Sequence, residues 1–587
     1  MHFCARRRRG GPIAGRAPGG RYGSLELSVS DLPRAHPIRP TDDRSQLRAP
    51  LESLSLPARR GCARSTPHLA KKDPALQTLL TSGDICATDA DTIIVNLFAG
   101  VTAPAGATGA VDARLGGQIS KVARLGDLSG RANQVLTLYP GPELTADRVV
   151  VVGLGDAAKF SAEAAAEAAA AGVAAAAKAG SKRAAIVAFG AGVGGLSPAA
   201  AAEATILGAR LAAYRFDKYK TIRADDDSDP ELATVELVEF DAASLDELAK
   251  GMAAGNAIAD GVTLARNLQN SPPNDMNPGA IAEAARQMSE SEGLDCSTMD
   301  QDQMRAAGMG SLLAVAQGSE QPPHLITMIY EPDQAAAGTL AVVGKGVSFD
   351  TGGISIKPSA RMEDMKFDMS GAAATIGTML AVARLKPALK VVGIVPTVEN
   401  MPSGRALRPS DVVTASNGKT VEIVSTDAEG RMILADALCH AQTFEPDAIV
   451  DMATLTGAVV IALGHFATGM MVTSPELADR LSRAGDKVNE RVWELPLWDE
   501  YEENIKAKTG DLDNTGGRAA GSINGGMFLK HFAGQYPFAH LDIAGTAYEG
   551  KKTPLWQGGG KGVGVRLITQ LVRDWPGPLA GDATSAQ

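Results

Sequence analysis

The stretch 420-TVEIVSTDAEGRMILADALCHA-441 joins two local patterns. Its first residues are β-branched and typical of a strand, and after Arg431 it becomes a run of apolar and small residues that suits a helix. Asp427, Glu429 and Arg431 stand at every second position where extended structure gives way to that helix. Side chains two apart on a strand point the same way. The spacing therefore predicts that two carboxylates, with the guanidinium, point into one space.

Further charged side chains follow a second strand pattern upstream. In "GTLAVVGKGVSFDTGGISIKP", residues 340–343 predict a buried strand, and a glycine-rich loop then supplies Lys345, Asp350 and Lys357. Asp368 stands directly before a helix of small residues, where the helix dipole also favours a carboxylate. These groups extend the acidic cluster of the opening stretch.

Four carboxylates in one place, Asp350, Asp368, Asp427 and Glu429, would repel one another and raise one another's pKa unless something positive lay among them. Carboxylate oxygens suit hard or borderline divalent ions, and two ions about 3.5 to 4 Å apart need bridging carboxylates. None of the 8 histidines is interleaved with these acids or shows HExxH spacing. The sequence therefore predicts two divalent metal ions rather than a histidine-bound zinc.

Two glycine motifs have simpler interpretations than nucleotide binding. "GKT" at 418–420 lacks the earlier glycine of a P-loop, since that position is Val413, and its preceding Asn417 makes a hairpin turn the better interpretation. Gly153 and Gly155 follow the strand-like "VVVV", but the third glycine of a dinucleotide-binding fingerprint is missing. We interpret both as structural turns.

A chain of 587 residues, 45% of them apolar, predicts two folded domains. Residues 1–75 are rich in Arg, Gly, Pro and Ser, which predicts a disordered tail. An organellar targeting segment and a nonfunctional extension stay open as alternatives for these residues. Strand-like runs alternate with alanine-rich helical stretches over residues 76–250, an N-terminal α/β domain. Residues 251–587 form a second, larger α/β domain.

The composition of the chain argues against several classes of function. A net charge of -10 argues against a nucleic-acid surface, which would need a basic face. The 5 cysteines are scattered and odd in number, so they predict neither a disulfide framework nor a CxxC metal site, but a reducing compartment. No apolar run approaches the roughly 18 residues that span a bilayer. We expect a cytoplasmic protein without a membrane segment.

The opening stretch resembles the signature N-T-D-A-E-G-R-L of the cytosol aminopeptidase family, the leucyl aminopeptidases. "VGKGVSFDTGGISIKP", "MKFDMSGAAA", "DMATLTGA" and "AHLDIAG" resemble further family segments in the same order, over roughly 256–571. The chain departs from the signature at Ser425 and Met432. Ser425 is shorter than the usual asparagine and lacks the amide group that could form a hydrogen bond there.

The resemblance implies a metallo-exopeptidase of the leucyl aminopeptidase type. Its fold would be two α/β domains, the C-terminal one with a central mixed sheet flanked by helices. It would remove N-terminal Leu and other apolar residues from peptides with a free N-terminus, using a water activated by two divalent ions, Mn²⁺ or Zn²⁺. The resemblance also implies a homohexamer with catalytic domains clustered inside.

Family roles carry over by motif position. The metal ligands would be Lys345, Asp350, Asp368, Asp427 and Glu429. Asp350 and Glu429 would bridge the two ions, while Lys345 and Asp368 would serve the more exchangeable, or differently constrained, site. A lysine can ligate only when neutral, so the metal would have to lower its pKa. The simpler role of Lys345 is an ion pair with Asp350.

The resemblance assigns the remaining charged and apolar groups to substrate and catalysis. Lys357 would stabilise the oxyanion at the scissile carbonyl, and Arg431 would hold a bicarbonate that relays protons, because no side chain of the cluster is an obvious general base. Their simpler roles are an exposed loop lysine and a salt bridge to Glu429. The substrate-binding residues would be Met365, Thr454, Leu455 and Gly457. A methionine beside a helix is, in isolation, more often part of a core.

Two other classes stay open at this point. A two-metal phosphoester hydrolase would also use clustered carboxylates, but it would not explain a lysine ligand or the whole series of motifs. A DNA-binding scaffold is disfavoured by the net charge of -10.

Overall fold

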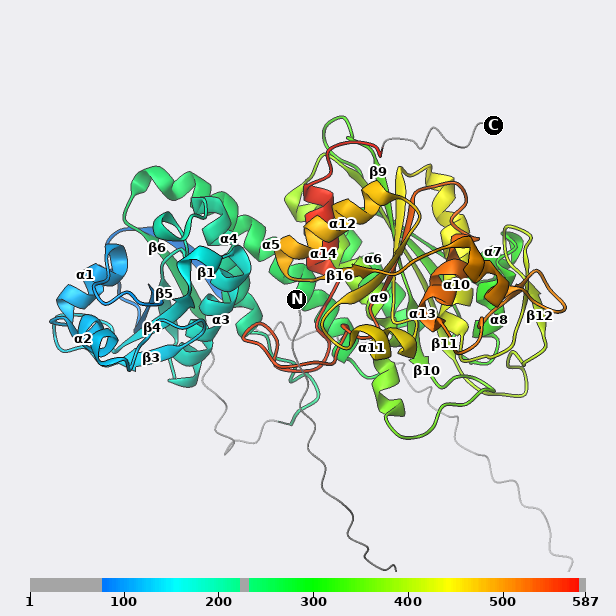
Figure 1. Ribbon diagram of the computed structural model, residues 1–587, viewed down its shortest axis with the longest axis horizontal. Helices are drawn as coiled ribbons and strands as arrows, with labels where there is room; N and C mark the ends of the chain where they lie inside the picture. The colour runs from blue at the N-terminus through cyan, green and yellow to red at the C-terminus, as the bar shows by residue number, and fades with distance from the viewer. Residues whose placement is uncertain (1–75, 222–231, 580–587) are drawn as a thin grey trace, which may run out of the picture. The chain divides into compact units, whose positions relative to one another are not determined.

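The computed structural model describes residues 76–221 and 232–579 (Figure 1). The tail predicted for residues 1–75 lies outside the described residues. Two larger sheets organise the rest, each with helices on both faces. The prediction of two α/β domains, the second with a mixed sheet, is confirmed.

The first sheet has strand order β1-β6-β5-β2-β4-β3, and only β3 runs antiparallel to its neighbour. Its strands are β1 Gln77–Ser82, β2 Thr92–Phe98, β3 Val135–Leu138, β4 Arg148–Gly155, β5 Arg183–Ile186 and β6 Thr234–Glu239. Its helices are α1 Gly106–Arg114, α2 Gln118–Leu125, α3 Ala162–Lys178 and α4 Pro198–Ala212, with 3-10 turns η1 Ile85–Ala87, η2 Ala157–Lys159, η3 Gly192–Gly194 and η4 Ala242–Ser244.

Continuous apolar strands explain why this sheet is buried on both faces. In β2, Ile93 and Val95 pack with α1 and α2, whereas Ile94 packs with the alanine-rich α3 and α4. Small alanines let those helices approach the sheet and each other closely. Gly153 and Gly155 end β4 against the turn at residues 130–132, which agrees with their interpretation as structural glycines.

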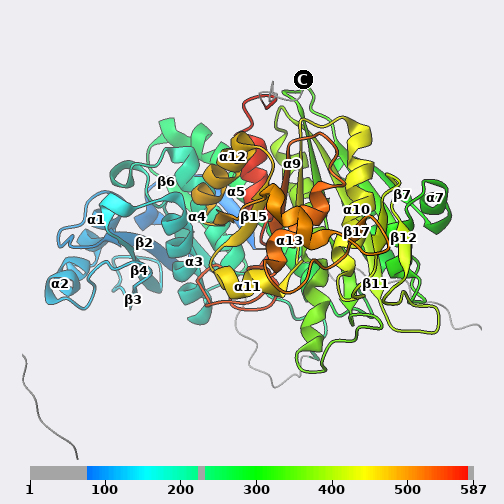
Figure 2. The same cartoon turned by 45° about the vertical axis from the view of Figure 1, so that its right-hand side comes forward.

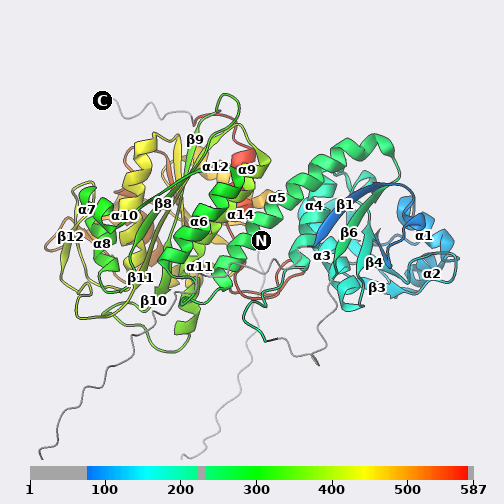
Figure 3. The ribbon, with the colours of Figure 1, turned by 180° about the vertical axis from the view of Figure 1, so that it is seen from behind.

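The long helix α5 Leu245–Asn270 packs against α4 and also against α9 Ser370–Leu385 of the second sheet (Figure 3). The predicted domain boundary between residues 250 and 251 falls inside α5, and that division of the chain stays a prediction. No helix among the described residues is long and apolar enough to cross a membrane.

The second sheet is mixed, with order β16-β15-β18-β14-β9-β11-β8-β7 and β10 paired to β11 (Figure 2). Its strands are β7 Asp295–Met299, β8 His324–Tyr330, β9 Thr339–Gly344, β10 Gly346–Asp350, β11 Lys390–Asn400, β14 Ala448–Ala453, β15 Thr468–Val472, β16 Val492–Glu494 and β18 Phe538–Asp542. The other helices of this part are α6 Pro278–Glu292, α7 Gln301–Ala306, α8 Gly310–Ala316, α10 Glu429–Ala441, α11 Gly457–Leu463, α12 Pro475–Val488, α13 Gly521–Lys530 and α14 Val565–Arg573, with η5 Met362–Met369, η6 Gln442–Phe444 and η7 Asp499–Ile505.

The central strand β9 shows how this sheet divides the core. Leu340 and Val342 pack on the side of α9 and α14, and Ala341 and Val343 pack on the side of α10 and α13. The predicted strand at 340–343 is therefore confirmed, and both of its faces are buried.

A small third sheet contains the hairpin predicted at Asn417 and Gly418. Strands β12 Val412–Thr414 and β13 Thr420–Glu422 pair antiparallel around Gly418, whose φ is +86°, and β17 Leu512–Asp513 pairs parallel with β13. The hairpin interpretation of "GKT" is confirmed.

Candidate metal centre

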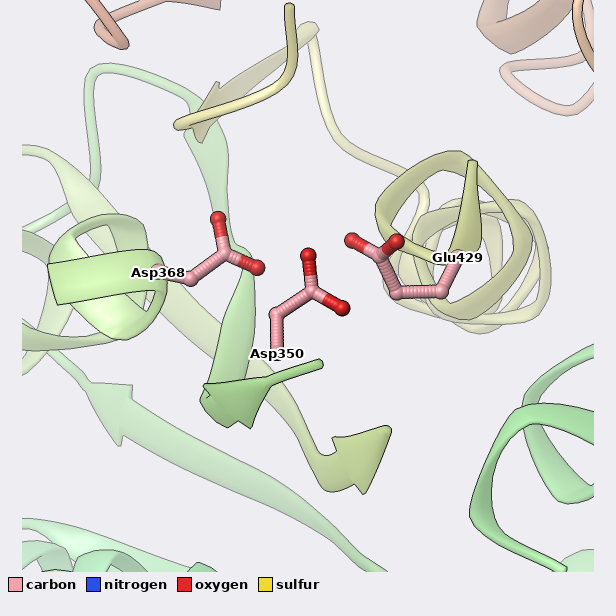
Figure 4. Close-up of side chains that lie close together, drawn as sticks. All are labelled: Asp350, Asp368 and Glu429. Atoms are coloured by element: carbon pink, nitrogen blue, oxygen red, sulfur yellow. The ribbon is translucent and has the colours of Figure 1, made fainter. Parts of the chain in front are cut away.

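Three carboxylates from three different elements face one another beside the second sheet (Figure 4). Asp350 is the last residue of β10, Asp368 lies in η5 directly before α9, and Glu429 is the first residue of α10. Each offers an oxygen, and these oxygens lie within 4.8 Å of one another. All three residues are buried. The fold thus concentrates negative charge at one point away from water.

The ammonium group of Lys345 lies between two of these acids. Its Nζ is 2.8 Å from Asp368 Oδ1 and 2.9 Å from Glu429 Oε1, and it also donates to the carbonyl oxygen of Thr454 at 2.9 Å. Burial alone would lower the pKa of Lys345, but the surrounding carboxylates outweigh burial and raise it. The simpler prediction, an ion pair between Lys345 and Asp350, is not what the structure forms.

The ammonium group of Lys357 lies beside two other carboxylates, those of Asp350 and Asp427. Its Nζ lies 2.7 Å from Asp350 Oδ2 and also contacts Asp427 Oδ1. The Lys357 side chain is 22% exposed and that of Asp427 37%, so this half of the centre opens to solvent while the Lys345 half is closed. Lys357 is therefore not the free loop lysine of the simpler prediction.

The centre is short of positive charge. Burial and the neighbouring charge of Glu429 raise the pKa of Asp350 to about 6, and burial raises the pKa of Asp368 well above its ordinary range. Asp368 Oδ2 and Glu429 Oε2 are buried without a hydrogen-bond partner. Carboxylate oxygens that are crowded, desolvated and unpaired are the donor set that divalent ions require. The residues present fit a divalent metal centre.

An asparagine that the sequence analysis missed orients Asp350. Asn400 ends β11 directly opposite Asp350 in the β10 pairing, and its Nδ2 donates to Asp350 Oδ1 at 2.8 Å and to the Thr426 carbonyl at 3.1 Å. The backbone N–H of Gly352 donates to the same Asp350 oxygen at 2.8 Å. The one available signal was a polar residue at the end of an apolar strand.

The local structure around Asp427 differs from the prediction. Strand β13 ends at Glu422, and residues 423–428 form a loop, so Asp427 and Glu429 do not share a strand face. The buried Asn514 holds this loop, because its Oδ1 accepts from the N–H groups of Val424 at 2.8 Å and Ser425 at 3.2 Å. Hydrogen bonds between the Asn514 side chain and the backbone replace strand pairing in this loop. The prediction that Asp427 and Glu429 point the same way because they alternate along a strand was therefore wrong.

Ser425 has its own role in this loop. Its Oγ accepts from the N–H of Asp427 at 3.2 Å, and its carbonyl oxygen accepts from Asn514 Nδ2 at 2.7 Å. The loop that carries Asp427 is therefore braced although the usual asparagine of the signature is absent.

Arg431 is the third residue of α10 and is buried. Its Nη1 donates to the Thr515 carbonyl at 3.3 Å, its guanidinium lies 6.0 Å from the Phe528 ring centre, and its Nε has no partner. Burial lowers the pKa of Arg431, and the charges of Glu429 and Asp542 oppose that effect. Among the described residues no carboxylate forms a salt bridge with it, so the simpler prediction of a pair with Glu429 is wrong.

The four residues predicted to bind substrate lie on two neighbouring segments. Met365 is partly buried in η5, three residues before Asp368. Thr454 touches the centre directly, because its Oγ1 donates to Asp368 Oδ1 at 2.8 Å. Leu455 is partly buried, whereas Gly457 is exposed and no atom lies within 4 Å of the place where its Cβ would be. Their contact with substrate stays a prediction.

A buried carboxylate cluster beside a mixed sheet fits the class of metal-dependent hydrolases. The catalytic-domain model of the cytosol aminopeptidase family matches residues 263–569, and the N-terminal-domain model of the same family matches residues 94–223. The chain belongs to the cytosol aminopeptidase family, as the resemblance predicted, and is an aminopeptidase of that metal-dependent family.

Known relatives are similar to this chain over most of its length. A "Probable cytosol aminopeptidase" of Syntrophotalea carbinolica is 45% identical over 443 residues, which cover 76% of this chain and 89% of the relative. The solved structure of the bottromycin maturation enzyme BotP in complex with Mn has a TM-score of 0.72 and 34% identity, covering 82% of this chain and 99% of that one. A tomato leucine aminopeptidase mutant has a TM-score of 0.76 and 29% identity, covering 86% and 97%.

Proposed function

We propose that this aminopeptidase uses two divalent ions, Mn²⁺ or Zn²⁺, to remove Leu and other apolar residues from the N-terminus of peptides. The observation that carries the proposal is the buried group of Asp350, Asp368 and Glu429, with two unpaired carboxylate oxygens. The likeness to a structure solved with Mn and to a leucine aminopeptidase supports the choice of metal and substrate.

Five residues would hold the ions: Lys345, Asp350, Asp368, Asp427 and Glu429. When bound, two divalent ions acidify a water molecule and polarise the carbonyl of the peptide bond. Lys345 would have to give up its proton to act as a ligand, and its contacts with Asp368 and Glu429 keep it at the right place for this exchange.

Two positively charged side chains, Lys357 and Arg431, would take part in catalysis without holding the metal ions. Burial lowers the pKa of Lys357, but Asp350, Glu429 and Asp427 outweigh burial and raise it, so the side chain is an ammonium at neutral pH. A fixed cation in a partly closed site stabilises the negative charge that develops on the scissile carbonyl oxygen. Arg431, buried with its Nε free, would bind a small anion such as bicarbonate that carries protons.

The four predicted substrate residues would serve the amino-terminal residue of the peptide. Met365 would contribute an adaptable apolar wall and Leu455 a second one. Thr454 would set the position of the peptide backbone, and the open space beside Gly457 would leave room for it. We further propose a cytoplasmic homohexamer.

The test is hydrolysis of leucine p-nitroanilide by metal-stripped protein after addition of Mn²⁺, Zn²⁺, Co²⁺ or Mg²⁺. We expect metal-dependent release that is lost in Glu429→Gln and with the N-acetylated substrate. The matched control is Asp479→Asn, which removes an exposed acid on α12 that pairs with Arg483. Folded protein that releases no product with any metal, or that instead cleaves p-nitrophenyl phosphate, would overturn the proposal.

A further inference from the structure

Another buried carboxylate, that of Asp542, holds the chain segment that follows the neighbouring strand β14. Asp542 ends β18 and is 0% exposed, and it lies opposite Ala453, the last residue of β14. Its Oδ1 accepts from the N–H of Leu455 at 3.1 Å and from that of Thr456 at 3.4 Å. Its Oδ2 accepts from Thr456 Oγ1 at 2.6 Å. One side chain thus holds three donors of one short turn.

That turn carries two contacts of the metal centre. The carbonyl oxygen of Thr454 accepts from Lys345 Nζ at 2.9 Å, and Thr454 Oγ1 donates to Asp368 Oδ1 at 2.8 Å. Thr454 directly precedes the two residues whose N–H groups Asp542 binds. A shift of this turn would therefore move the partner of Lys345 and the partner of Asp368 together.

We propose that Asp542 is a positioning residue, which fixes the turn at residues 454–456 and through Thr454 sets Lys345 and Asp368 for metal binding. The inference rests on the proposed two-metal function. Outer partners of metal ligands decide how well the ligands are oriented, and their loss costs about 10- to 100-fold in metal affinity or activity. Asp542 acts one step further out, since it touches neither Lys345 nor Asp368 in the hydrogen bonds of the described residues.

The same two strands provide a matched comparison. Asp451 of β14 and His540 of β18 lie opposite each other, two residues deeper, and Asp451 Oδ1 is 2.7 Å from His540 Nδ1. Asp451 is also 0% exposed. Its hydrogen bond goes to His540 rather than to the turn, so Asp451→Asn perturbs a buried carboxylate without releasing the turn.

The first measurement is hydrogen exchange of the metal-free protein, which does not depend on activity. Asp542→Asn keeps one neutral oxygen in place of the carboxylate, so the N–H groups of Leu455 and Thr456 lose a charged acceptor and Thr456 Oγ1 loses the oxygen to which it donates. Because hydrogen bonds to a charged acceptor are the stronger ones, we expect exchange at Leu455 and Thr456 to quicken at least tenfold relative to wild type. Asp451→Asn should leave these two amides unchanged. Equal protection of the turn in wild type and Asp542→Asn would overturn the inference.

The second measurement is Mn²⁺ affinity by calorimetry, together with kcat and KM. We expect Asp542→Asn to weaken Mn²⁺ binding about tenfold and to lower kcat, with less change in KM, while Asp451→Asn binds Mn²⁺ as wild type does. The same loss in both variants would mean that Asp542 has only a structural role. Wild-type protein that binds Mn²⁺ but does not hydrolyse peptides would overturn the proposed function and leave this comparison valid.

A milder pair of variants serves if Asp542→Asn does not fold. Thr456→Val removes the hydroxyl that donates to Asp542 Oδ2, and Thr456→Ser keeps it. We expect Thr456→Val to weaken Mn²⁺ binding severalfold and Thr456→Ser to restore it. Equal affinities in the two variants would contradict the positioning role.

Discussion

Gly430 lies directly against the side chain of Lys345. A Cβ at position 430 would be 2.5 Å from Cε and 2.6 Å from Nζ of Lys345, which is closer than carbon and nitrogen atoms approach without a bond. The glycine between Glu429 and Arg431 therefore leaves the space into which the lysine reaches. This requirement joins the first turn of α10 to the loop after β9.

Gly430→Ala tests that contact. The new methyl group would push the Lys345 ammonium away from Asp368 and Glu429, so we expect kcat to fall by about 10²-fold, as a displacement of about 1 Å at a reacting centre can cause. The helix itself should gain slightly, since alanine is the better helix former. Kinetics with leucine p-nitroanilide and thermal unfolding measure the two effects.

The control is Gly404→Ala, because no atom lies within 4 Å of a Cβ at that exposed position. Unchanged kcat in Gly430→Ala would show that Lys345 can move aside without cost, and that the glycine is not required for its placement.

Asn514→Ala tests the loop that carries Asp427. The side chain of Asn514 accepts two N–H groups and donates to the Ser425 carbonyl, and all three bonds would be lost. We expect the free energy of unfolding to fall by about 2–3 kcal/mol and the amides of 424–427 to exchange faster. Activity should fall further than stability explains, because Asp427 is freed. The control is Asn504→Ala, which removes a hydrogen bond to Asn524, and equal effects of the two variants would contradict this role of Asn514.

Much of the fold could be predicted from the sequence, because several strands and turns are marked by short contiguous patterns of residues. Residues 340–343 are an unbroken apolar run that Gly344 ends, and the turn at Asn417 and Gly418 is recognised from these two residues alone. The meeting of Asp350, Asp368 and Glu429 was also predicted, although the reason given for the Asp427 and Glu429 pair was wrong.

The hydrogen bonds that join residues far apart in the chain could not be predicted from the sequence. Asn514 replaces strand pairing around Ser425 from about ninety positions away, and Asn400 reaches Asp350 across fifty positions. Asparagine is common in loops for local reasons, so nothing in either residue's own neighbourhood marks the distant partner. Only the pairing of strands brings such residues together.

Asp436→Asn gives a pH-dependent prediction outside the metal centre. Burial raises the pKa of Asp436 to about 6, although its carboxylate accepts from the N–H groups of Leu312 and Ser416 at 2.8 Å. The folded carboxyl keeps its proton up to about pH 6, whereas the unfolded one loses it near pH 3.9. Its contribution to stability is therefore present below about pH 4 and is lost as the pH rises to 6, by about 3 kcal/mol at most.

The asparagine variant lacks this titration. We expect its free energy of unfolding, relative to wild type, to rise between pH 4 and pH 7, whatever constant cost the lost acceptor adds. Urea unfolding at several pH values measures the difference. Asp411→Asn should change in the opposite direction and mainly below about pH 4, because the hydrogen bond from Arg408 lowers the pKa of that half-buried carboxyl. A flat difference for Asp436→Asn would contradict the raised pKa.

Glu163→Gln tests the ion pair between α3 and α14. Glu163 pairs with Arg566 where the two side chains are only 13% and 11% exposed, whereas Glu203 and Arg573 pair at 22% and 31%. Removing one charge from the more buried pair leaves Arg566 poorly compensated, so we expect a loss of about 1–3 kcal/mol for Glu163→Gln. Glu203→Gln should lose about 1 kcal/mol or less, because water screens that pair. Urea unfolding of both variants decides, since equal losses would mean that burial does not strengthen the dependence on Glu163.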